Sequence, residues 1–239
     1  MVIAVWGRDG IGKSGLCDEL GKLFAKTGVT AIIDTDLTQP TLPVRLNGAK
    51  IDSSASLGKA IGMGTSDAAL YLHQHPKLKT LFYAGLTDQD EYMSYELGLE
   101  ADHAAQDFVE RCTELADTVI LDLSGQRSDP FLPTALIHAG KAITLFTPDV
   151  QGICWFNSIK PLISTMNAQE RSLPVAAMMD RHHDISAVEK ATDTMLAVTL
   201  PYVQEFRQDG ISKAATRAAM RYCQEVNKLQ AMLKGADAI

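Results

Sequence analysis

Near its start the chain reads Gly7-Arg8-Asp9-Gly10-Ile11-Gly12-Lys13-Ser14, followed by Gly15, which matches the spacing G-x-x-x-x-G-K-[ST]. This stretch follows the apolar run 2–6 and opens a helical pattern, which is the setting that a phosphate-binding loop requires. Glycines let the backbone N–H groups point inward at phosphate oxygens, and the helix start adds its positive dipole end. The lysine can reach the β- and γ-phosphates, and the serine hydroxyl can bind Mg²⁺. We therefore expect residues 7–15 to bind a nucleotide's phosphates.

Short apolar runs alternate with helical patterns along the rest of the chain. The runs predict strands buried on both faces, at 2–6, 30–33, 81–84, 118–121, 142–146 and 174–179. The helical patterns fall at about 13–27, 103–116, 149–168 and 212–233. This alternation predicts an α/β protein with the three-layer P-loop NTPase fold and a mostly parallel central sheet. We find no long linker, so residues 1–239 are treated as a single domain, in which we expect 53–66 to form a mobile loop with short helices.

Composition narrows the class of protein further. The 239 residues are 46% hydrophobic and 21% charged, which is typical of a globular protein and excludes a wholly disordered chain. A net charge of −7 argues against DNA coating by bulk charge. The four cysteines are far apart and form no CxxC pair, so we expect free, mostly buried thiols. No stretch approaches the ~18 apolar residues of a membrane span, and we expect a cytoplasmic protein.

Carboxylates follow two of the predicted strands. Asp34-Thr35-Asp36 comes directly after the run 30–33, and Asp122 follows the run 118–121 and precedes Ser-Gly. In parallel sheets, ligands bind beyond the carboxyl ends of the strands. Phosphoryl transfer needs carboxylates near the metal ion and the attacking water. We therefore expect Asp34, Asp36 and Asp122 to lie beside the phosphate loop.

These segments together resemble the MinD/ParA family of deviant Walker-A ATPases. The phosphate loop is similar to the family's K-G-G-x-G-K-[ST], residues 32–40 resemble its first switch, and 116–122 resemble its second-switch strand. Residues 139–149 resemble the strand that ends in a Thr-Pro turn, and Leu200-Pro201-Tyr202 with 210–212 resembles a late segment near the base. The resemblance spans nearly the whole chain. Pilus-localisation relatives of the TadZ/CpaE type are also similar, because their loops are degenerate.

The resemblance implies a role for each matching residue. Lys13 corresponds to the phosphate lysine and Ser14 to the Mg²⁺ ligand. Asp36 corresponds to the carboxylate that orients the hydrolytic water. Asp34 corresponds to a residue that supports the metal shell, and Asp122 to one that holds a metal-bound water. The implied cofactors are ATP or ADP with Mg²⁺, bound in a face-to-face homodimer.

Two parts of the motif depart from the family. Arg8 occupies the position of the signature lysine that reaches the partner's phosphates, and could act as a trans arginine finger. Asp9 replaces a glycine, and a carboxylate beside triphosphate is repulsive unless it turns away or pairs with a cation, such as the partner's Arg8.

In the base-reading position, where the family usually has Asn, the chain has Asp180-Arg181, with Pro201 further on. Base identity is therefore less defined than phosphate binding.

The resemblance implies a slowly hydrolysing, dimeric switch ATPase that positions or partitions cargo. The cargo classes are a plasmid or chromosome, a division site, and pilus or secretion machinery, with recruitment to the nucleoid, the membrane or a cell pole. Alternatives are a nucleotide-binding hub with little or no hydrolysis, which the Arg8-Asp9 pair favours, and a metallochaperone-type ATPase, which lacks its cysteine pair here. A small-molecule kinase would need an arginine-rich lid that the chain lacks.

Surface contacts have few sequence candidates. The apolar residues of 213–234 recur at helical spacing, and we expect this helix to pack on the domain rather than on a membrane. The stretch 160–171 and the Arg217/Arg221 face are the only candidates for DNA contact, and we expect a solvated face at both. His182-His183, His73 and His75 are interpreted as solvated loop residues.

Overall fold

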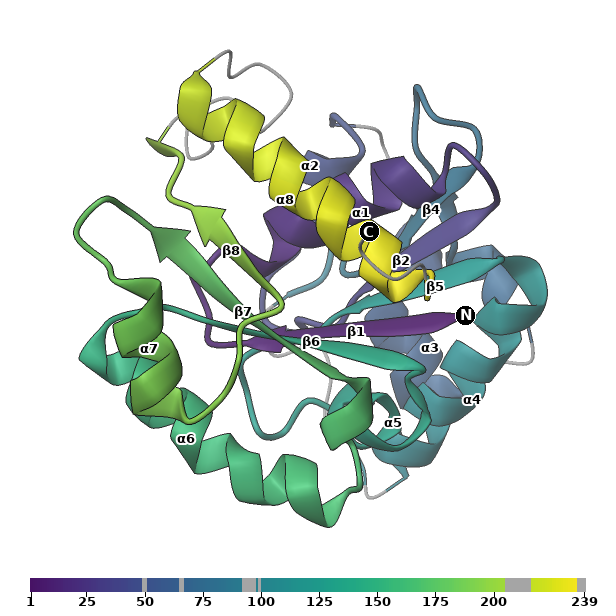
Figure 1. Ribbon diagram of the computed structural model, residues 1–239. Coiled ribbons are helices and arrows are strands. Elements are labelled where there is room, and N and C mark those ends of the chain that lie inside the picture. The colour runs from purple at the N-terminus through teal and green to yellow at the C-terminus, as the bar shows by residue number, and fades with distance from the viewer. Residues whose placement is uncertain (49–50, 65–66, 92–97, 99, 205–215, 236–239) are drawn as a thin grey trace.

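The computed structural model describes residues 1–48, 51–64, 67–91, 98, 100–204 and 216–235. Its centre is an eight-stranded sheet in the order β3-β4-β2-β5-β1-β6-β7-β8 (Figure 1). The short β3 pairs antiparallel with β4, and the other neighbouring strands pair in parallel. The strands are β1 Val2–Gly7, β2 Thr30–Asp34, β3 His73–Gln74, β4 Leu81–Ala84, β5 Thr118–Asp122, β6 Lys141–Phe146, β7 Ser172–Met179 and β8 Val198–Pro201.

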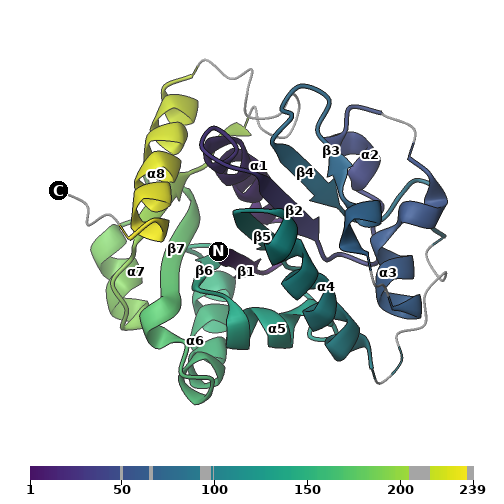
Figure 2. The same cartoon turned by 90° about the vertical axis from the view of Figure 1, so that its right-hand side faces the viewer.

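Helices cover both faces of this sheet. One apolar cluster joins the sheet to α1, α2 and α8, and a second joins its other face to α3 through α7. Figures 1 and 2 both show α8 lying beside α1. The helices are α1 Lys13–Phe24, α2 Leu42–Arg45, α3 Leu57–Met63, α4 Ala101–Leu115, α5 Phe131–His138, α6 Val150–Thr165, α7 Ile185–Thr192 and α8 Arg217–Leu233.

Strand β1 shows why apolar and polar residues do not alternate in the predicted strands. Its residues Ile3 and Val5 lie in the cluster with α1 and α8, whereas Ala4 and Trp6 lie in the cluster with α3 through α7. Both faces of a central parallel strand are covered, so apolar residues are required at every position. This arrangement confirms the predicted three-layer α/β fold.

The predicted strands and long helices are confirmed, with ends that shift by a few residues. The helix expected at 149–168 ends at Thr165. Short helices occur at 53–55 and 57–63, in the segment where a loop with short helices was expected. The sequence prediction missed α2, α5, α7, β3 and β8. The expected start of the last helix at 212 lies outside the described residues, and α8 begins at Arg217.

Helix α8 packs on the domain, as predicted, but through a narrower face than expected. Its buried residues are Ala219, Tyr222, Val226, Leu229 and Leu233, which contact β8 and α1. Met220 and Cys223, which the helical spacing assigned to the apolar face, are exposed. All four cysteines are free, but only Cys17 and Cys112 are buried, so the expectation of mostly buried thiols is wrong for the other two. No helix in the described ranges is long and apolar enough to span a bilayer.

The carboxyl ends of the central strands meet at one edge of the sheet. Asp34 at the end of β2 lies opposite Asp122 at the end of β5, and Val5 near the end of β1 pairs with the same Asp122. The loop that connects β1 to α1 therefore begins beside both carboxylates. This edge positions the candidate site.

Candidate functional site

The loop from Gly7 to Ser14 connects the end of β1 to the start of α1 at Lys13. Gly10 and Gly12 have φ angles of 76° and 93°, a left-handed conformation that side chains rarely tolerate. Gly7 has no room for a side chain, because a Cβ there would overlap the carbonyl oxygen of Leu145 on β6. These constraints explain three glycines of the motif.

A pocket of about 250 Å³ lies at this loop, and we call it the phosphate pocket. The loop and the start of α1 line one side, and the segments after β2 and β5 line the other. Of the predicted site residues, it brings together Asp9, Gly10, Gly12, Lys13, Ser14, Gly15, Asp34, Asp36 and Asp122. Gly7 and Ile11 are buried behind the loop, in β1 and in the apolar cluster under α1.

Lys13 points back into its own loop. Its Nζ donates to the carbonyl oxygen of Arg8 at 2.9 Å and to Asp9 Oδ1 at 3.0 Å, and its side chain is 7% exposed. Asp9 Oδ1 also accepts from the backbone N–H of Gly125 at 2.8 Å. Burial opposes ionisation of Asp9, but the hydrogen bond and the positive charge of Lys13, together with the hydrogen bond from Gly125, outweigh it and hold the pKa of Asp9 below its usual value. Within the chain, the cation that compensates Asp9 is Lys13, and a contact with the partner's Arg8 stays a prediction.

Arg8 lies at the rim of the loop. Its Nη2 donates to Gln151 Oε1, in the first turn of α6, at 3.1 Å. The pKa of Asp149 lies below its usual value, mainly because of a hydrogen bond from the Gly152 N–H; burial opposes this shift, and Thr147 and the charge of Arg8 add to it. Arg8 therefore does not line the phosphate pocket, and its predicted role across a dimer stays a prediction.

A buried ion cluster lies at the floor of the phosphate pocket. The guanidinium of Arg45, the last residue of α2, donates from Nη2 to Asp34 Oδ2 at 3.2 Å and also to Asp122 Oδ2. Its Nη1 donates to Asp18 Oδ1 on α1 at 2.8 Å. Burial raises the pKa of Asp34 to about 6, and the charge of Asp122 adds to the rise while Arg45 opposes it. Arg45 was not predicted from the sequence, where its local signal is a charged residue between Val44 and Leu46.

Asp36 is held by its own turn. Its Oδ1 accepts from the backbone N–H of Thr38 at 2.9 Å and from the Thr38 hydroxyl at 2.5 Å. Its own N–H donates to Asp34 Oδ1 at 3.2 Å. The half-buried carboxylate of Asp36 lines the phosphate pocket, where the resemblance expects it to orient a water.

Asp129 is a second residue that the sequence analysis missed. Its Oδ2 accepts from the Thr35 hydroxyl, after β2, and from the Ser124 N–H, after β5, at 2.9 Å. Its Oδ1 accepts from the N–H of Phe131 at the start of α5, at 2.8 Å. Burial raises the pKa of Asp129 to about 6, although these hydrogen bonds oppose the rise. One carboxylate thus joins both segments that flank the phosphate pocket.

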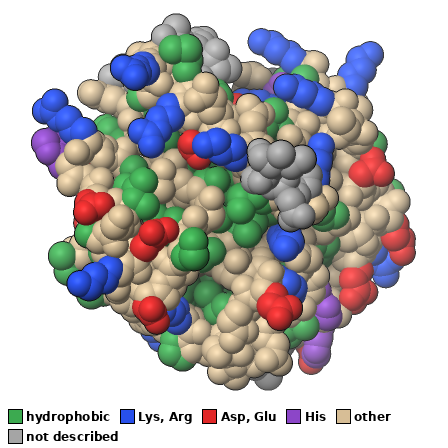
Figure 3. All heavy atoms as spheres, in the orientation of Figure 1, with side chains coloured by type: hydrophobic (Ala, Val, Ile, Leu, Met, Phe, Trp, Pro, Cys, Tyr) green, Lys and Arg blue, Asp and Glu red, His purple; other side chains and the backbone are tan. Residues whose placement is uncertain are grey.

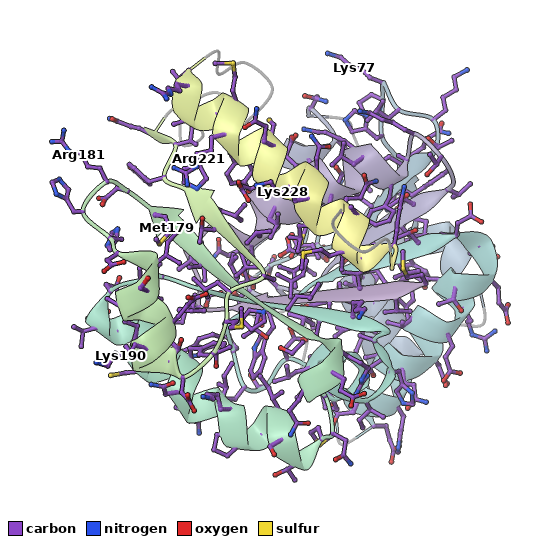
Figure 4. The ribbon with its side chains drawn as sticks, viewed as in Figure 1. Lys77, Met179, Arg181, Lys190, Arg221 and Lys228 are labelled. Atoms are coloured by element: carbon purple, nitrogen blue, oxygen red, sulfur yellow. The ribbon has the colours of Figure 1, made fainter. Side chains whose placement is uncertain are left out.

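The predicted base-reading residues lie in a different pocket, of about 810 Å³, which we call the β7–β8 pocket. Asp180, Arg181 and Pro201 line it, together with Arg217 and Arg221 of α8. In Figure 4 the Arg181 side chain extends away from the body of the molecule, whereas Met179 and Arg221 lie at the pocket. No described lining residue is shared with the phosphate pocket, so the structure does not bring the two predicted groups together.

The loop at Asp180 is organised by its own side chains. Asp180 Oδ1 accepts from the N–H of His182 at 2.8 Å and lies 2.9 Å from His183 Nδ1. Figure 3 shows Lys and Arg side chains over this face of the molecule, with Asp and Glu side chains among them. The expectations of a solvated loop and of a solvated basic face at Arg217 and Arg221 agree with these exposed side chains.

Comparison with solved structures shows extensive likeness of fold. The MinD cell division protein of Aquifex aeolicus is 15% identical, with a TM-score of 0.74 over 100% of this chain and 98% of that chain. MinD of Pyrococcus horikoshii, complexed with Mg-ADP, is 12% identical, with a TM-score of 0.77 over 100% and 99%. A ParA family ATPase of Chlorobium tepidum is 14% identical, with a TM-score of 0.71 over 99% and 97%.

The chain has the MinD/ParA fold. No family model matches the chain, and no curated protein matches its sequence. The likeness of fold agrees with the resemblance drawn from the motifs, and it extends over the segments that carry them. The more specific likeness to TadZ/CpaE relatives stays a hypothesis.

The donor set at the pocket floor fits magnesium. In this MinD/ParA fold the exposed hydroxyl of Ser14 and the carboxylates of Asp34 and Asp122 meet at one pocket, and all are hard oxygen donors. The described residues form no cluster of three His, Cys, Asp or Glu side chains that would hold a metal by themselves. Mg²⁺ usually takes one or two protein donors and completes its shell with water and phosphate oxygens. Arg45 already forms ion pairs with both carboxylates, so Mg²⁺ binding to their oxygens would require its guanidinium to move.

Proposed function

We propose that this chain is a MinD/ParA-type ATPase, a nucleotide-dependent switch that pairs around two ATP molecules and positions or partitions cargo. The observation that carries the proposal is the phosphate pocket, where left-handed glycines, the helix start at Lys13 and the carboxylates of Asp34 and Asp122 converge. MinD of Pyrococcus horikoshii, which has this fold, is complexed with Mg-ADP. We also propose that residues 1–239 act as one domain.

The chemistry we propose is in-line attack of water on the γ-phosphorus, which breaks the bond to the bridging oxygen and releases phosphate and ADP. Lys13 and the loop N–H groups stabilise the charge that develops on the phosphate oxygens. Asp36, at the pocket wall, orients the water. Ser14, Asp34 and Asp122 would hold Mg²⁺, which would supply positive charge to the phosphate oxygens. Arg8 contributes its charge from the partner subunit's loop. We expect slow turnover, because such proteins use the nucleotide as a switch.

Replacing Lys13 by alanine is expected to weaken ATP binding by about tenfold to a hundredfold, since a hydrogen bond from a charged group contributes about 1.5–3 kcal/mol. The measurements are calorimetric nucleotide binding and phosphate release. Lys22→Ala is the matched control, because Lys22 also lies on α1 but pairs with Glu19 away from the pocket. Phosphate release equal to that of the wild type in Lys13→Ala would remove the enzymatic proposal.

Two further assays address pairing and cargo. Light scattering with a non-hydrolysable ATP analogue is expected to show a doubled mass, and a mass unchanged from the nucleotide-free form would contradict the dimer. Co-sedimentation with DNA and with liposomes then distinguishes the cargo classes, because a partitioning switch binds one of these surfaces in its ATP state. Recruitment to the nucleoid, the membrane or a cell pole follows from that result.

A second candidate function is a nucleotide-binding hub with little hydrolysis, and the Asp9–Lys13 contact favours it. An ammonium group has three N–H donors. Two of them already bind the Arg8 carbonyl and Asp9 Oδ1, which leaves Lys13 one donor for phosphate. Asp9 also places a carboxylate on the wall of the phosphate pocket.

Asp9→Asn tests this candidate, because it keeps the size of the side chain and removes its charge. We expect ATP affinity to rise by about threefold to tenfold, a modest gain because Asp9 is largely exposed and its charge is screened. Asp107→Asn, on the exposed side of α4, changes the net charge equally and is expected to leave affinity unchanged. An equal rise in both variants would show a general charge effect rather than a local contact.

A further inference from the structure

Arg45 connects three separate elements from a buried position. Its side chain is 5% exposed, and it makes ion pairs with Asp18 of α1, Asp34 of β2 and Asp122 of β5. Its guanidinium also lies 5.7 Å from the centre of the Tyr83 ring. The planar fork of arginine suits this arrangement, because its two terminal nitrogens can serve different carboxylates at once.

The two carboxylates at the pocket floor depend on this one cation. Asp34 and Asp122 are direct neighbours on β2 and β5, and their side chains are only 5% and 2% exposed. Two buried carboxylates this close repel each other unless a positive charge lies between them. Among the residues that the structure describes, Arg45 is the only Lys or Arg in an ion pair with either of them.

The same carboxylates are the ones that we expect to face magnesium. Arg45 and a metal ion would therefore supply the same positive charge at the same place. We propose that Arg45 is the counter-cation of the nucleotide-free protein, and that its guanidinium withdraws from Asp34 and Asp122 when Mg-nucleotide binds. This inference rests on the proposed function, and it adds a competitor for the metal within the chain itself.

Helix α2 is built in a way that permits this withdrawal. It is a single turn of four residues, and it is attached to the core through Leu42 and Arg45 while Val44 is 80% exposed. The Thr41 hydroxyl, just before the helix, donates to Asp34 Oδ2, the oxygen that also receives Arg45. A change at the Asp34 carboxylate therefore acts on both ends of α2.

The test measures thermal stability without nucleotide, with Mg²⁺ alone as the probe. Arg45→Gln leaves two buried carboxylates without a cation, and we expect Tm to fall by about 10 °C. About 10 mM Mg²⁺ is expected to restore roughly half of that loss, because the metal binds the folded state at the vacated carboxylates. In the wild type, where Arg45 occupies them, the same Mg²⁺ is expected to change Tm by about 1 °C or less.

Arg171→Gln is the matched control. Arg171 donates to the carbonyl oxygens of Leu136, Ile137 and Ala139 at the end of α5, so its loss destabilises the protein without exposing a carboxylate pair. Its Tm is expected to fall with no recovery in Mg²⁺. If Arg45→Gln does not fold, Arg45→Lys is the second variant. Its compact ammonium lacks the two separated nitrogens with which Arg45 reaches Asp18 on one side and the Asp34–Asp122 pair on the other, so it is expected to gain more Tm from Mg²⁺ than the wild type does.

Two results would overturn the inference. One is a fall in the Tm of the Arg45 variants that Mg²⁺ does not restore, and the other is a rise in the Tm of the wild type with Mg²⁺ that equals the rise in the variants. Either result would make Arg45 a purely structural ion-pair partner. Neither result would touch the proposed function, because nucleotide binding and its dependence on Lys13 are measured separately. Conversely, Mg²⁺ rescue of Arg45→Gln would stand even if Lys13→Ala bound ATP normally.

Discussion

Replacing Gly152 by alanine is expected to lower the free energy of unfolding by about 3 kcal/mol, although alanine is the better helix former. Gly152 lies in the first turn of α6, where its N–H donates to the capping carboxylate of Asp149 at 2.7 Å. A Cβ at this position would overlap the carbonyl oxygen of Thr147 and lie 2.8 Å from its carbonyl carbon. Backbone atoms at the end of β6 would have to move, and with them the start of α6.

The sign of this change shows which effect is larger, the steric overlap with Thr147 or the helix propensity, because helix propensity alone predicts a stabilisation of about 1 kcal/mol for Gly→Ala. Denaturant unfolding monitored by circular dichroism measures the difference. Gly140→Ala is the control, since a Cβ there would meet its nearest neighbour, the Val2 carbonyl oxygen, at an ordinary 3.6 Å. A Gly152→Ala protein as stable as Gly140→Ala would show that the turn between β6 and α6 yields easily.

The free energy of unfolding is also expected to fall by about 3 kcal/mol as the pH rises from about 4 to about 7, because of Asp129 alone. Burial raises the pKa of this carboxyl to about 6 in the folded protein, against 3.8 for an ordinary aspartate. Below pH 3.8 Asp129 is protonated in both the folded and the unfolded protein, so it does not change the free energy of unfolding. As the pH rises through the window, the unfolded chain ionises first, and the folded state loses relative stability until Asp129 also ionises.

The comparison that isolates this effect is the wild type against Asp129→Asn, measured by urea unfolding across the window. Asp34, whose pKa burial also raises to about 6, lowers stability over the same range in both proteins and cancels in the difference. The stability advantage of the wild type over Asp129→Asn is expected to shrink as the pH rises. Asp107→Asn, on the exposed side of α4, is the control, and a pH dependence in Asp129→Asn as steep as in the wild type would refute the assignment.

The fold was largely predictable because its strongest signals are local. Short apolar runs that end in a glycine, an aspartate or a Thr-Pro turn favour buried strands, and the phosphate loop fixes where β1 ends and α1 begins. Helix α5 escaped prediction because its sequence, FLPTALIH, is apolar almost throughout and shows no helical period. Strand β8 has only four residues, half of them partly exposed, which gives a weak pattern.

The residues of the phosphate pocket were predictable because their sequence signals are local. The arginine that pairs with the pocket's carboxylates was not predictable. Lys13 and Ser14 belong to one contiguous motif, and Asp34 and Asp122 follow strands whose ends converge. Arg45, by contrast, lies outside these motifs and meets Asp122 across 77 residues of sequence. Such contacts arise from tertiary packing, which a single sequence does not reveal.

The three hydrogen bonds received by Asp129 have a mechanical consequence. They tie Thr35 after β2, Ser124 after β5 and the first turn of α5 to a single rigid carboxylate. A ligand that pulls either flanking segment must therefore drag the other, and the same motion reaches α5 on the opposite side of the sheet from α1. Movements of the segments beside the terminal phosphate would thus reach the start of α5 through the Asp129 carboxylate.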